Sequence, residues 1–316
     1  MKGKTALRYV LQIVITLLGI SFIMFSLTML STQDLAKQLI TGAEDTVVTQ
    51  AQIDAVTKEL GLDQPFLVQY WNWLSHAVQG DFGFSYMVKK PVVDKLMECL
   101  PATIYLGVTS LVMMLIIAVP LGVLSAFYSN RAIDYICRGV SFFGISIPGF
   151  WMGLMLLWFF GLKLGWFPIV STRMAPDTIF LPALTLAISM SSKYMRQVRS
   201  TVLEELHQDY VIGARARGMS TAYILIREVL PNALLPLITL LGLSLGSLLG
   251  GAAVVEIVFN WPGLGNLAIK AIEYRDFLLL QGVIVWIASM YMIINLLVDF
   301  SYALLDPRLK KKGGEA

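Results

Sequence analysis

Apolar residues gather in six long runs along the chain, separated by polar segments. The runs cover residues 10–30, 102–127, 138–162, 179–195, 233–258 and 277–305. A helix of roughly 20 apolar residues is long enough to cross the hydrocarbon core of a bilayer. The pattern therefore predicts an all-α, polytopic membrane protein with six transmembrane helices.

Composition agrees with this pattern and excludes a water-soluble globule. Of 316 residues, 57% are hydrophobic and 14% are charged, against roughly 25% charged in ordinary soluble domains. The net charge of +3 is too small to indicate a nucleic-acid partner. In the predicted topology, Cys99 and Cys137 fall on opposite sides of the bilayer, so they are expected to be free thiols.

Basic residues are distributed unequally between the two sides of the predicted membrane. An even number of spans places both termini on one side, which carries Lys2, Lys4, Arg8, Arg131, Arg138, Arg196, Arg199, Arg215, Arg217, Arg227, Arg308, Lys310, Lys311 and Lys312. The short loops on the other side carry only Lys163, Arg173, Lys270 and Arg275. By the positive-inside rule both termini are cytoplasmic, and 1–30 is a retained, lipid-contacting anchor rather than a cleaved signal peptide.

The first extracytoplasmic segment, 31–101, has the pattern of a small helical cap. Thr49 with Gln52 three residues later resembles a capping box, and that helix is expected to end at Gly61. Pro65 opens a second helix and Pro91 a third, which leads into the membrane. The cap could receive a partner that delivers substrate, or simply cover the helix ends, and the sequence leaves both interpretations open.

Motifs for metal or nucleotide chemistry are weak. His76 and His207 have no histidine or cysteine at a metal-ligand spacing, so no metal site is expected. Gly263, Gly265 and Ala268 match a dinucleotide fingerprint, but they lie in a predicted extracytoplasmic loop without a βαβ unit. No cofactor and no catalytic residue follow from the sequence.

Ionisable residues near the membrane are few. Lys193, Glu256 and Asp299 fall near predicted helix ends and are interpreted as rim residues. An ion-coupled carrier generally needs a buried carboxylate or a broken-helix site near the midplane. The sequence therefore disfavours an ion-coupled carrier, and it also shows no nucleophile and base for an intramembrane hydrolase.

The cytoplasmic segment 196–232 is long, polar and predicted to be helical. Its distinctive positions are Asp209, Tyr210, Ala214, Arg215, Ala216, Gly218, Leu230 and Pro231. Asp209 suits a helix start, and Gly218 ends that helix without a Cβ penalty. Ser220 can cap the next helix. The small residues Ala214 and Ala216 let another surface approach this helix closely, and Pro231 sets the entry into the fifth span. The segment could transmit a push from a cytoplasmic partner or be a solvated amphipathic loop.

The same segment, with DYVIGARARG at 209–218 and Leu230-Pro231 twelve residues after Gly218, resembles the EAA loop of ABC importer permeases, in the peptide and nickel branch. GLDQP at 61–65, DFGFS at 81–85, LPAT at 100–103 and FNWPGLGNL at 259–267 are similar to the same branch. The resemblance implies a type I ABC importer permease fold and one of two homologous permease subunits. It also implies a place in the inner membrane of a bacterium, an extracytoplasmic binding protein and two ATPase subunits that dock on the EAA loops. Ile212, Gly213 and Glu228 depart from the wider pattern.

Small residues and prolines within the predicted spans suggest how a bundle could pack and open. Gly242, Gly246 and Gly250 form one stripe, for pairing with a second permease subunit or for packing within the chain. Pro120 and the pair Pro148-Gly149 are expected to kink the second and third spans.

These features define four predicted regions. They are a transmembrane helix at 1–30, the cap at 31–101, a five-helix permease core at 102–305 that contains the coupling loop 196–232, and a basic cytoplasmic tail at 306–316. The resemblance favours nickel, carried as a chelate, over dipeptides or oligopeptides as the substrate. A stand-alone secondary carrier and a membrane scaffold are the alternatives from a different class.

Overall fold

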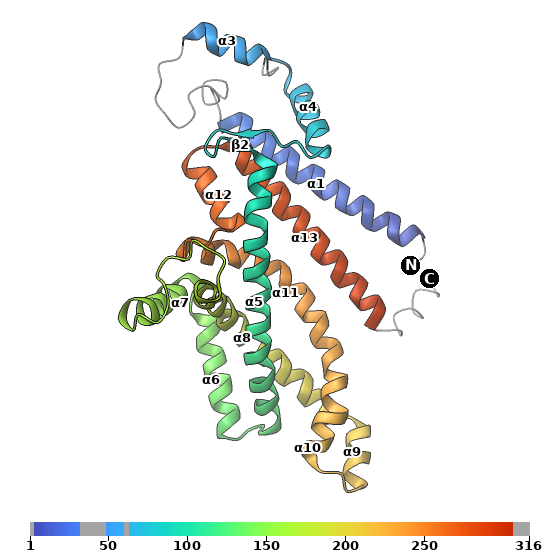
Figure 1. The fold of residues 1–316 in the computed structure, drawn as a ribbon. Helices are drawn as coiled ribbons and strands as arrows, with labels where there is room; N and C mark the ends of the chain where they lie inside the picture. The colour runs from blue at the N-terminus through green and yellow to red at the C-terminus, as the bar shows by residue number, and fades with distance from the viewer. Residues whose placement is uncertain (1–2, 32–48, 60–62, 306–316) are drawn as a thin grey trace. The chain divides into compact units, whose positions relative to one another are not determined.

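The computed structural model describes residues 3–31, 49–59 and 63–305, with side chains left out at several positions within helices, among them 242–250 and 298–305 (Figure 1). The helices are α1 Gly3–Ser31, α3 Gln50–Glu59, α4 Phe66–Val78, α5 Val92–Phe127, α6 Ala132–Ser146, α7 Gly149–Leu156, the π-helix η1 Leu157–Lys163, α8 Pro176–Leu206, α9 Asp209–Ala216, α10 Thr221–Ile224, the π-helix η2 Leu225–Val229, α11 Leu230–Val258, α12 Leu264–Glu273 and α13 Phe277–Leu305. A short hairpin, β1 Phe84–Ser85 with β2 Lys90–Pro91, interrupts them. The all-α prediction is confirmed apart from this hairpin.

Three described helices are long and apolar enough to cross a membrane, namely Tyr9–Leu30, Val92–Phe127 and Phe277–Leu297. Helix α6 and the helical segment 149–163 would add a fourth crossing if the two are taken as one broken span, although they are bent by 102° relative to each other. Helices α8 and α11 contain the predicted fourth and fifth runs. The predicted number of six spans is therefore not confirmed by the described residues.

The predicted third span, 138–162, is wrong as a single kinked helix, because the chain breaks at Pro148. Ile147 is extended, with φ −87° and ψ 125°, as expected for a residue that precedes proline. Pro148 then occupies the N-cap position of α7. Pro120, in contrast, lies inside α5, which continues through it without a break.

The chain divides into two compact units, Met1–Ala102 with Gly263–Met292, and Thr103–Pro262 with Ile293–Ala316. In the first unit the predicted cap helices are present as α3 and α4. The backbone N–H and the hydroxyl of Thr49 both donate to Oε1 of Gln52, at 3.0 and 2.8 Å, which is one half of the predicted capping box. The predicted helix end at Gly61 lies outside the described residues.

A buried carboxylate that the sequence did not indicate organises the hairpin of the first unit. Oδ2 of Asp276 accepts hydrogen bonds from the Ser85 hydroxyl at 2.6 Å and the Met87 N–H at 3.1 Å. Its Oδ1 accepts from the Leu279 N–H at 3.0 Å, which caps the start of α13. One fully buried side chain thus joins the hairpin to a helix end.

We expect Asp276→Ala to destabilise this unit by about 2 kcal/mol or more, because it removes the helix cap and leaves the Ser85 hydroxyl and the Met87 N–H buried without an acceptor. Thermal unfolding of the purified protein in detergent measures the loss. Asp81→Ala is a matched control, since the Asp81 carboxylate accepts one exposed hydrogen bond from the Gly83 N–H. Equal effects of the two substitutions would contradict the assigned role of Asp276.

In the second unit, helix α8 is approached closely by α5 and α6 at glycine positions. A Cβ at Gly122 of α5 would lie 2.6 Å from the Val198 Cβ and 2.8 Å from the Met195 carbonyl oxygen. A Cβ at Gly144 of α6 would lie 2.0 Å from the Ser192 hydroxyl oxygen. Small residues let membrane helices come together in this way. The predicted stripe at Gly242, Gly246 and Gly250 lies outside the residues whose side-chain surroundings are described.

Candidate functional site

The predicted coupling segment forms a compact helical elbow, defined here as residues 207–229. Helix α9 begins with Asp209 in its first turn, where a negative charge favours the helix dipole, while Gln208 is the N-cap. It ends at Ala216, with Arg217 as the C-cap, and Gly218 follows with φ +80° and no atom within 4 Å of the place a Cβ would take. Glycine is therefore favoured at this position by backbone conformation rather than by space. The Ser220 hydroxyl accepts a hydrogen bond from the Tyr223 N–H and caps α10, as the sequence predicts.

Two of the predicted partner-facing residues instead hold the elbow to the rest of the chain. Ala214 is 1% exposed and belongs to a cluster with Val198, Val211 and Ile224. Its small size therefore allows packing within the chain, which corrects the expectation that it faces another surface. The Tyr210 hydroxyl donates to Glu205 Oε2 at 2.7 Å, and burial, followed by this hydrogen bond, raises the pKa of Tyr210 to about 12. Tyr210 therefore stays protonated as a donor and ties α9 to the end of α8.

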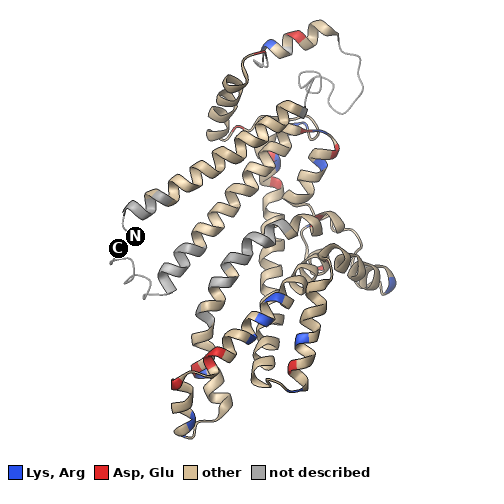
Figure 2. Ribbon diagram, turned by 180° about the vertical axis from the view of Figure 1, so that it is seen from behind, with Lys and Arg blue, Asp and Glu red and all other residues tan. Residues whose placement is uncertain are grey.

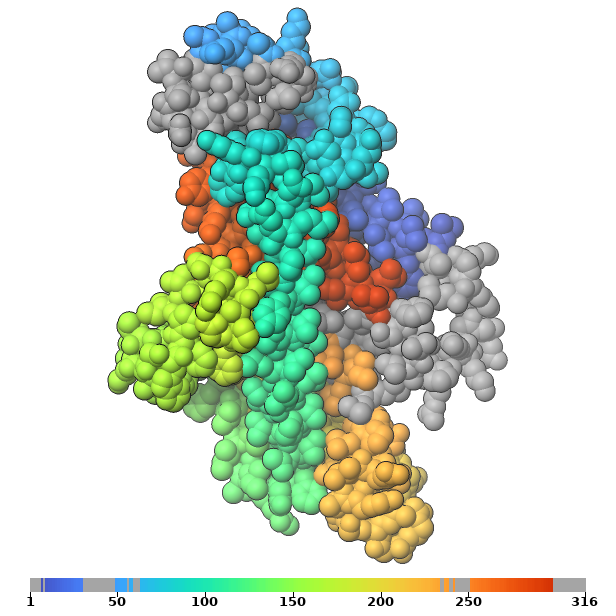
Figure 3. All heavy atoms as spheres, in the orientation of Figure 1, coloured from blue at the N-terminus to red at the C-terminus, as the bar shows by residue number. Residues whose placement is uncertain are grey.

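The same cluster extends to the end of α5. Buried Ala126 and partly buried Phe127 of α5 pack with the elbow residues, and the space-filling view shows the atoms of α9 and α10 beside this end of α5 (Figure 3). The elbow is thus seated on α5 and α8 by apolar contacts, so a force on α9 would act on both helices.

Several side chains of the elbow are exposed, and we call this set the outer face. It consists of Ile212, Arg215 and Ala216 of α9, Tyr223 of α10 and Ile226 of η2. Ile212 and Ile226 are 58% and 66% exposed. Apolar side chains accompanied by arginine are typical of a protein interface. Of the two predicted alanines, only Ala216 lies on this face.

Leu230 and Pro231 do not separate a surface helix from a membrane helix. Helices α10, η2 and α11 follow one another without a loop from Thr221 to Val258. The Leu230 N–H bonds to the Leu225 carbonyl, five residues back, which defines a π-helical turn directly before Pro231. Leu230 packs against the apolar cluster, whereas Pro231 is exposed. The elbow is therefore continuous with α11.

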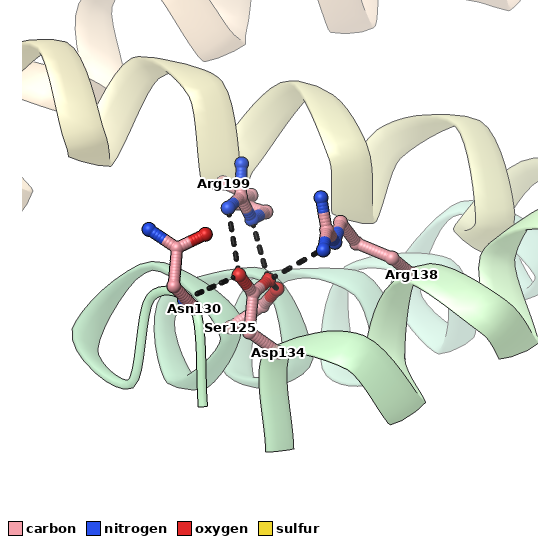
Figure 4. A network of polar contacts seen from close by, with 5 residues as sticks. All are labelled: Ser125, Asn130, Asp134, Arg138 and Arg199. Atoms are coloured by element: carbon pink, nitrogen blue, oxygen red, sulfur yellow. Dashed lines mark hydrogen bonds and ion pairs between the residues drawn. The ribbon is translucent and has the colours of Figure 1, made fainter. Parts of the chain in front are cut away.

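A buried ion-pair network ties α8 to the α5–α6 turn (Figure 4). The Arg199 Nε and Nη2 donate to the two carboxylate oxygens of Asp134 at 2.7 and 2.8 Å. The Ser125 hydroxyl and the Asn130 N–H add bonds of 2.7 and 2.8 Å, and Arg138 Nε lies 3.7 Å away. The Asp134 side chain is fully buried. A bidentate, charge-assisted pair of this kind fixes both distance and orientation.

The sequence contains part of the signal for this network. Asp134 is an acidic residue in the first turn of α6, between Arg131 and Arg138, in a segment otherwise noted for positive charge. Its main partner, Arg199, is 65 residues away, so only the fold brings them together.

Charged residues are distributed unevenly along α8. Basic positions recur along this helix, and acidic positions gather near its junction with α9 (Figure 2). Arg199 lies ten residues before Asp209, the first residue of α9.

The structure also locates the other ionisable and motif residues noted in the sequence. Glu256 lies near the end of α11, as predicted, and its fully buried side chain accepts a hydrogen bond from the Thr103 hydroxyl at 2.8 Å. Lys193 lies in the middle of the 31-residue α8, because that helix continues well beyond the predicted span. The side chain of Asp299 lies outside the described residues. Gly265 and Ala268 lie on helix α12, in the segment between α11 and α13, with Gly263 as its N-cap.

No group of three or more histidine, cysteine, aspartate or glutamate side chains that could hold a metal occurs among the described residues. The elbow is packed against α5 and α8 and is continuous with α11.

Comparison with known proteins identifies the class. The profile of the family "Binding-protein-dependent transport system inner membrane component" matches residues 118–311, and the profile of its N-terminal companion matches 4–107. The chain belongs to this family of permeases. It is therefore a multi-pass membrane subunit of an ABC importer that works with ATPase and substrate-binding partners. It is not an enzyme, since separate ATPase subunits hydrolyse the ATP.

The alignments with individual relatives cover nearly the whole chain. The glutathione transport system permease protein GsiC of Escherichia coli K12 is 37% identical over 307 residues, covering 97% of this chain and 98% of the relative. GsiC of Shigella flexneri serotype 5b is equally similar. Among solved structures, a chain of the MetNI methionine ABC transporter has a TM-score of 0.56 at 20% identity, covering 67% of this chain and 96% of that one. The fold is that of the type I ABC importer permeases.

Proposed function

We propose that this chain forms one half of the translocation path of an ATP-driven importer for small peptides of the glutathione type. The observation that carries the proposal is the 37% identity, over 97% of the chain, to permeases of glutathione transport systems. The chain would pair with a second homologous permease subunit, be driven by two ATPase subunits and receive substrate from an extracytoplasmic binding protein. Both termini would be cytoplasmic, as the distribution of basic residues predicts.

The proposed mechanism is alternating access driven through the elbow. The ATPase subunits would grip the outer face around Ile212, Arg215 and Ala216, so that their closure on ATP moves α9. Two features support transmission from there: the hydrogen bond between Tyr210 and Glu205, and the unbroken helix from α10 into α11. The path would open outward with ATP bound and return inward after hydrolysis.

The prediction of a nickel chelate as the substrate stays a prediction. It rests on the resemblance of individual segments, whereas the full-length relatives named above carry glutathione in their names. The alternatives of a stand-alone carrier and a scaffold do not hold, because the chain belongs to the binding-protein-dependent family.

Reconstituted transport tests the proposal. The chain, its partner permease, the ATPase subunits and the binding protein are assembled in proteoliposomes, and uptake of labelled glutathione, a second tripeptide and a nickel–histidine chelate is compared. We expect peptide uptake that requires both ATP and the binding protein. Uptake of the nickel chelate alone would replace the peptide proposal, and uptake without ATP or without the ATPase subunits would contradict the mechanism.

A further inference from the structure

A cavity within the second unit is bordered by α7, α8 and α11. It has a volume of about 350 Å³ and is lined mainly by apolar groups, including Phe150, Met190 and Val254. The break at Pro148 contributes, because Gly149 at the start of α7 also lines it. Binding sites for small molecules commonly have this size and character, with few polar groups that fix orientation.

Lys193 supplies the charge in this cavity, since the other lining residues are neutral. Its side chain is exposed, and it forms no ion pair with any residue whose side chain is described. Arg199, on the same helix, shows the contrast, because its charge is neutralised by Asp134 within the fold. An ammonium group beside an apolar cavity attracts the anionic end of a ligand that the cavity holds. The Lys193 ammonium thus has a cavity beside it and no described counter-charge.

We propose that this cavity binds the carboxylate end of the transported substrate, with Lys193 as the counter-charge and Phe150, Met190 and Val254 as the apolar wall. The inference rests on the proposed peptide function and deepens it by naming the group that is recognised on the path. The proposed site would also discriminate between ligands by charge, since the Lys193 ammonium group repels a bare divalent cation but attracts a peptide carboxylate or an anionic chelate.

The test uses the complete transporter in proteoliposomes, with glutathione as the probe at saturating binding protein. Lys193→Met is expected to lower glutathione uptake per ATP hydrolysed by about 10-fold, because a charge-assisted contact is lost, while binding-protein-stimulated ATP hydrolysis stays at the wild-type rate. Lys193→Arg keeps the charge and should retain most of the uptake. Arg196→Met is the matched control, because Arg196 is exposed on the same helix but does not line the cavity.

Chemical rescue and cavity filling provide independent readouts. Alkylation of Lys193→Cys with 2-bromoethylamine rebuilds a primary amine of lysine length and should restore uptake, whereas the same treatment of Lys193→Ala should not. Val254→Trp, which fills the cavity without changing charge, should lower uptake in the same way as Lys193→Met.

The outcomes distinguish this inference from the proposed function. If the wild type imports no peptide, the proposed function fails. If the wild type imports glutathione and Lys193→Met does so with unchanged uptake per ATP, this inference alone is overturned. It is also overturned if Lys193→Met changes only the thermal stabilisation that anionic lipid gives the complex, because the cavity then holds a lipid headgroup.

Discussion

Substituting Asp134 by alanine is expected to destabilise the protein by about 3 kcal/mol or more. The substitution leaves the largely buried Arg199 guanidinium, which is 20% exposed, without its bidentate partner, and an unpaired buried charge is costly. It also removes the acceptor of the Ser125 hydroxyl and the Asn130 N–H. Thermal unfolding of the assembled transporter in detergent, monitored by the loss of intact complex on gel filtration, measures the effect.

Arg138→Met is the matched control for that substitution. Arg138 lies 3.7 Å from Asp134, but its side chain is 43% exposed, so its loss should cost at most about 1 kcal/mol. A double variant, Asp134→Leu with Arg199→Met, removes both charges and should recover part of the stability. If Asp134→Ala proves no worse than Arg138→Met, the network does not hold α8 to the α5–α6 turn.

Replacing Gly218 by valine is expected to abolish most transport and coupled ATP hydrolysis while leaving membrane insertion intact. The residue has φ +80°, a conformation that β-branched residues rarely adopt. The substitution should therefore unwind the end of α9 and displace the outer face. Uptake and binding-protein-stimulated ATP hydrolysis in proteoliposomes are the measurements, with membrane content of the chain determined by immunoblot.

Gly218→Asn is the matched control, because asparagine tolerates the left-handed region better than other non-glycine residues. It should keep a substantial share of transport, since a Cβ at this position meets no neighbour within 4 Å. Wild-type transport by Gly218→Val would show that the ending of α9 is unimportant for coupling. A loss in Gly218→Asn equal to that in the valine variant would indicate a cause other than backbone strain.

Local signals allowed much of the fold to be predicted. The C-terminal end of α9 and the cap on α10 follow from Gly218 and Ser220, whose roles depend only on neighbouring backbone. The starts of α4 and α5 follow from Pro65 and Pro91 in the same way. Apolar runs located the long helices because burial in lipid requires an uninterrupted apolar surface.

The features of the fold that could not be predicted from the sequence are hydrogen bonds between residues far apart in the chain and the size of the bend at Pro148. The bonds from Asp134 to Arg199 and from Asp276 to Ser85 join residues 65 and 191 positions apart. Pro148 predicted a kink, whereas the two helices beside it are bent by 102°, an angle that the presence of a proline does not specify. Ala214 shows the same limit, because a small residue can face either a partner or the chain's own core, and periodicity over one short helix does not decide between them.

The π-helical turn at Leu225–Val229 has a consequence for every residue that follows it. Such a turn holds one residue more than the corresponding α-helical turn, and one residue corresponds to about 100° of rotation. Because the extra residue is absorbed within this turn, deleting one residue from it restores an ordinary helix and leaves the orientation of α11 unchanged, whereas deleting a residue later in α11 turns everything beyond it by about 100°. The faces that α11 shows to its neighbours are thus insensitive to the loss of one residue from this five-residue stretch.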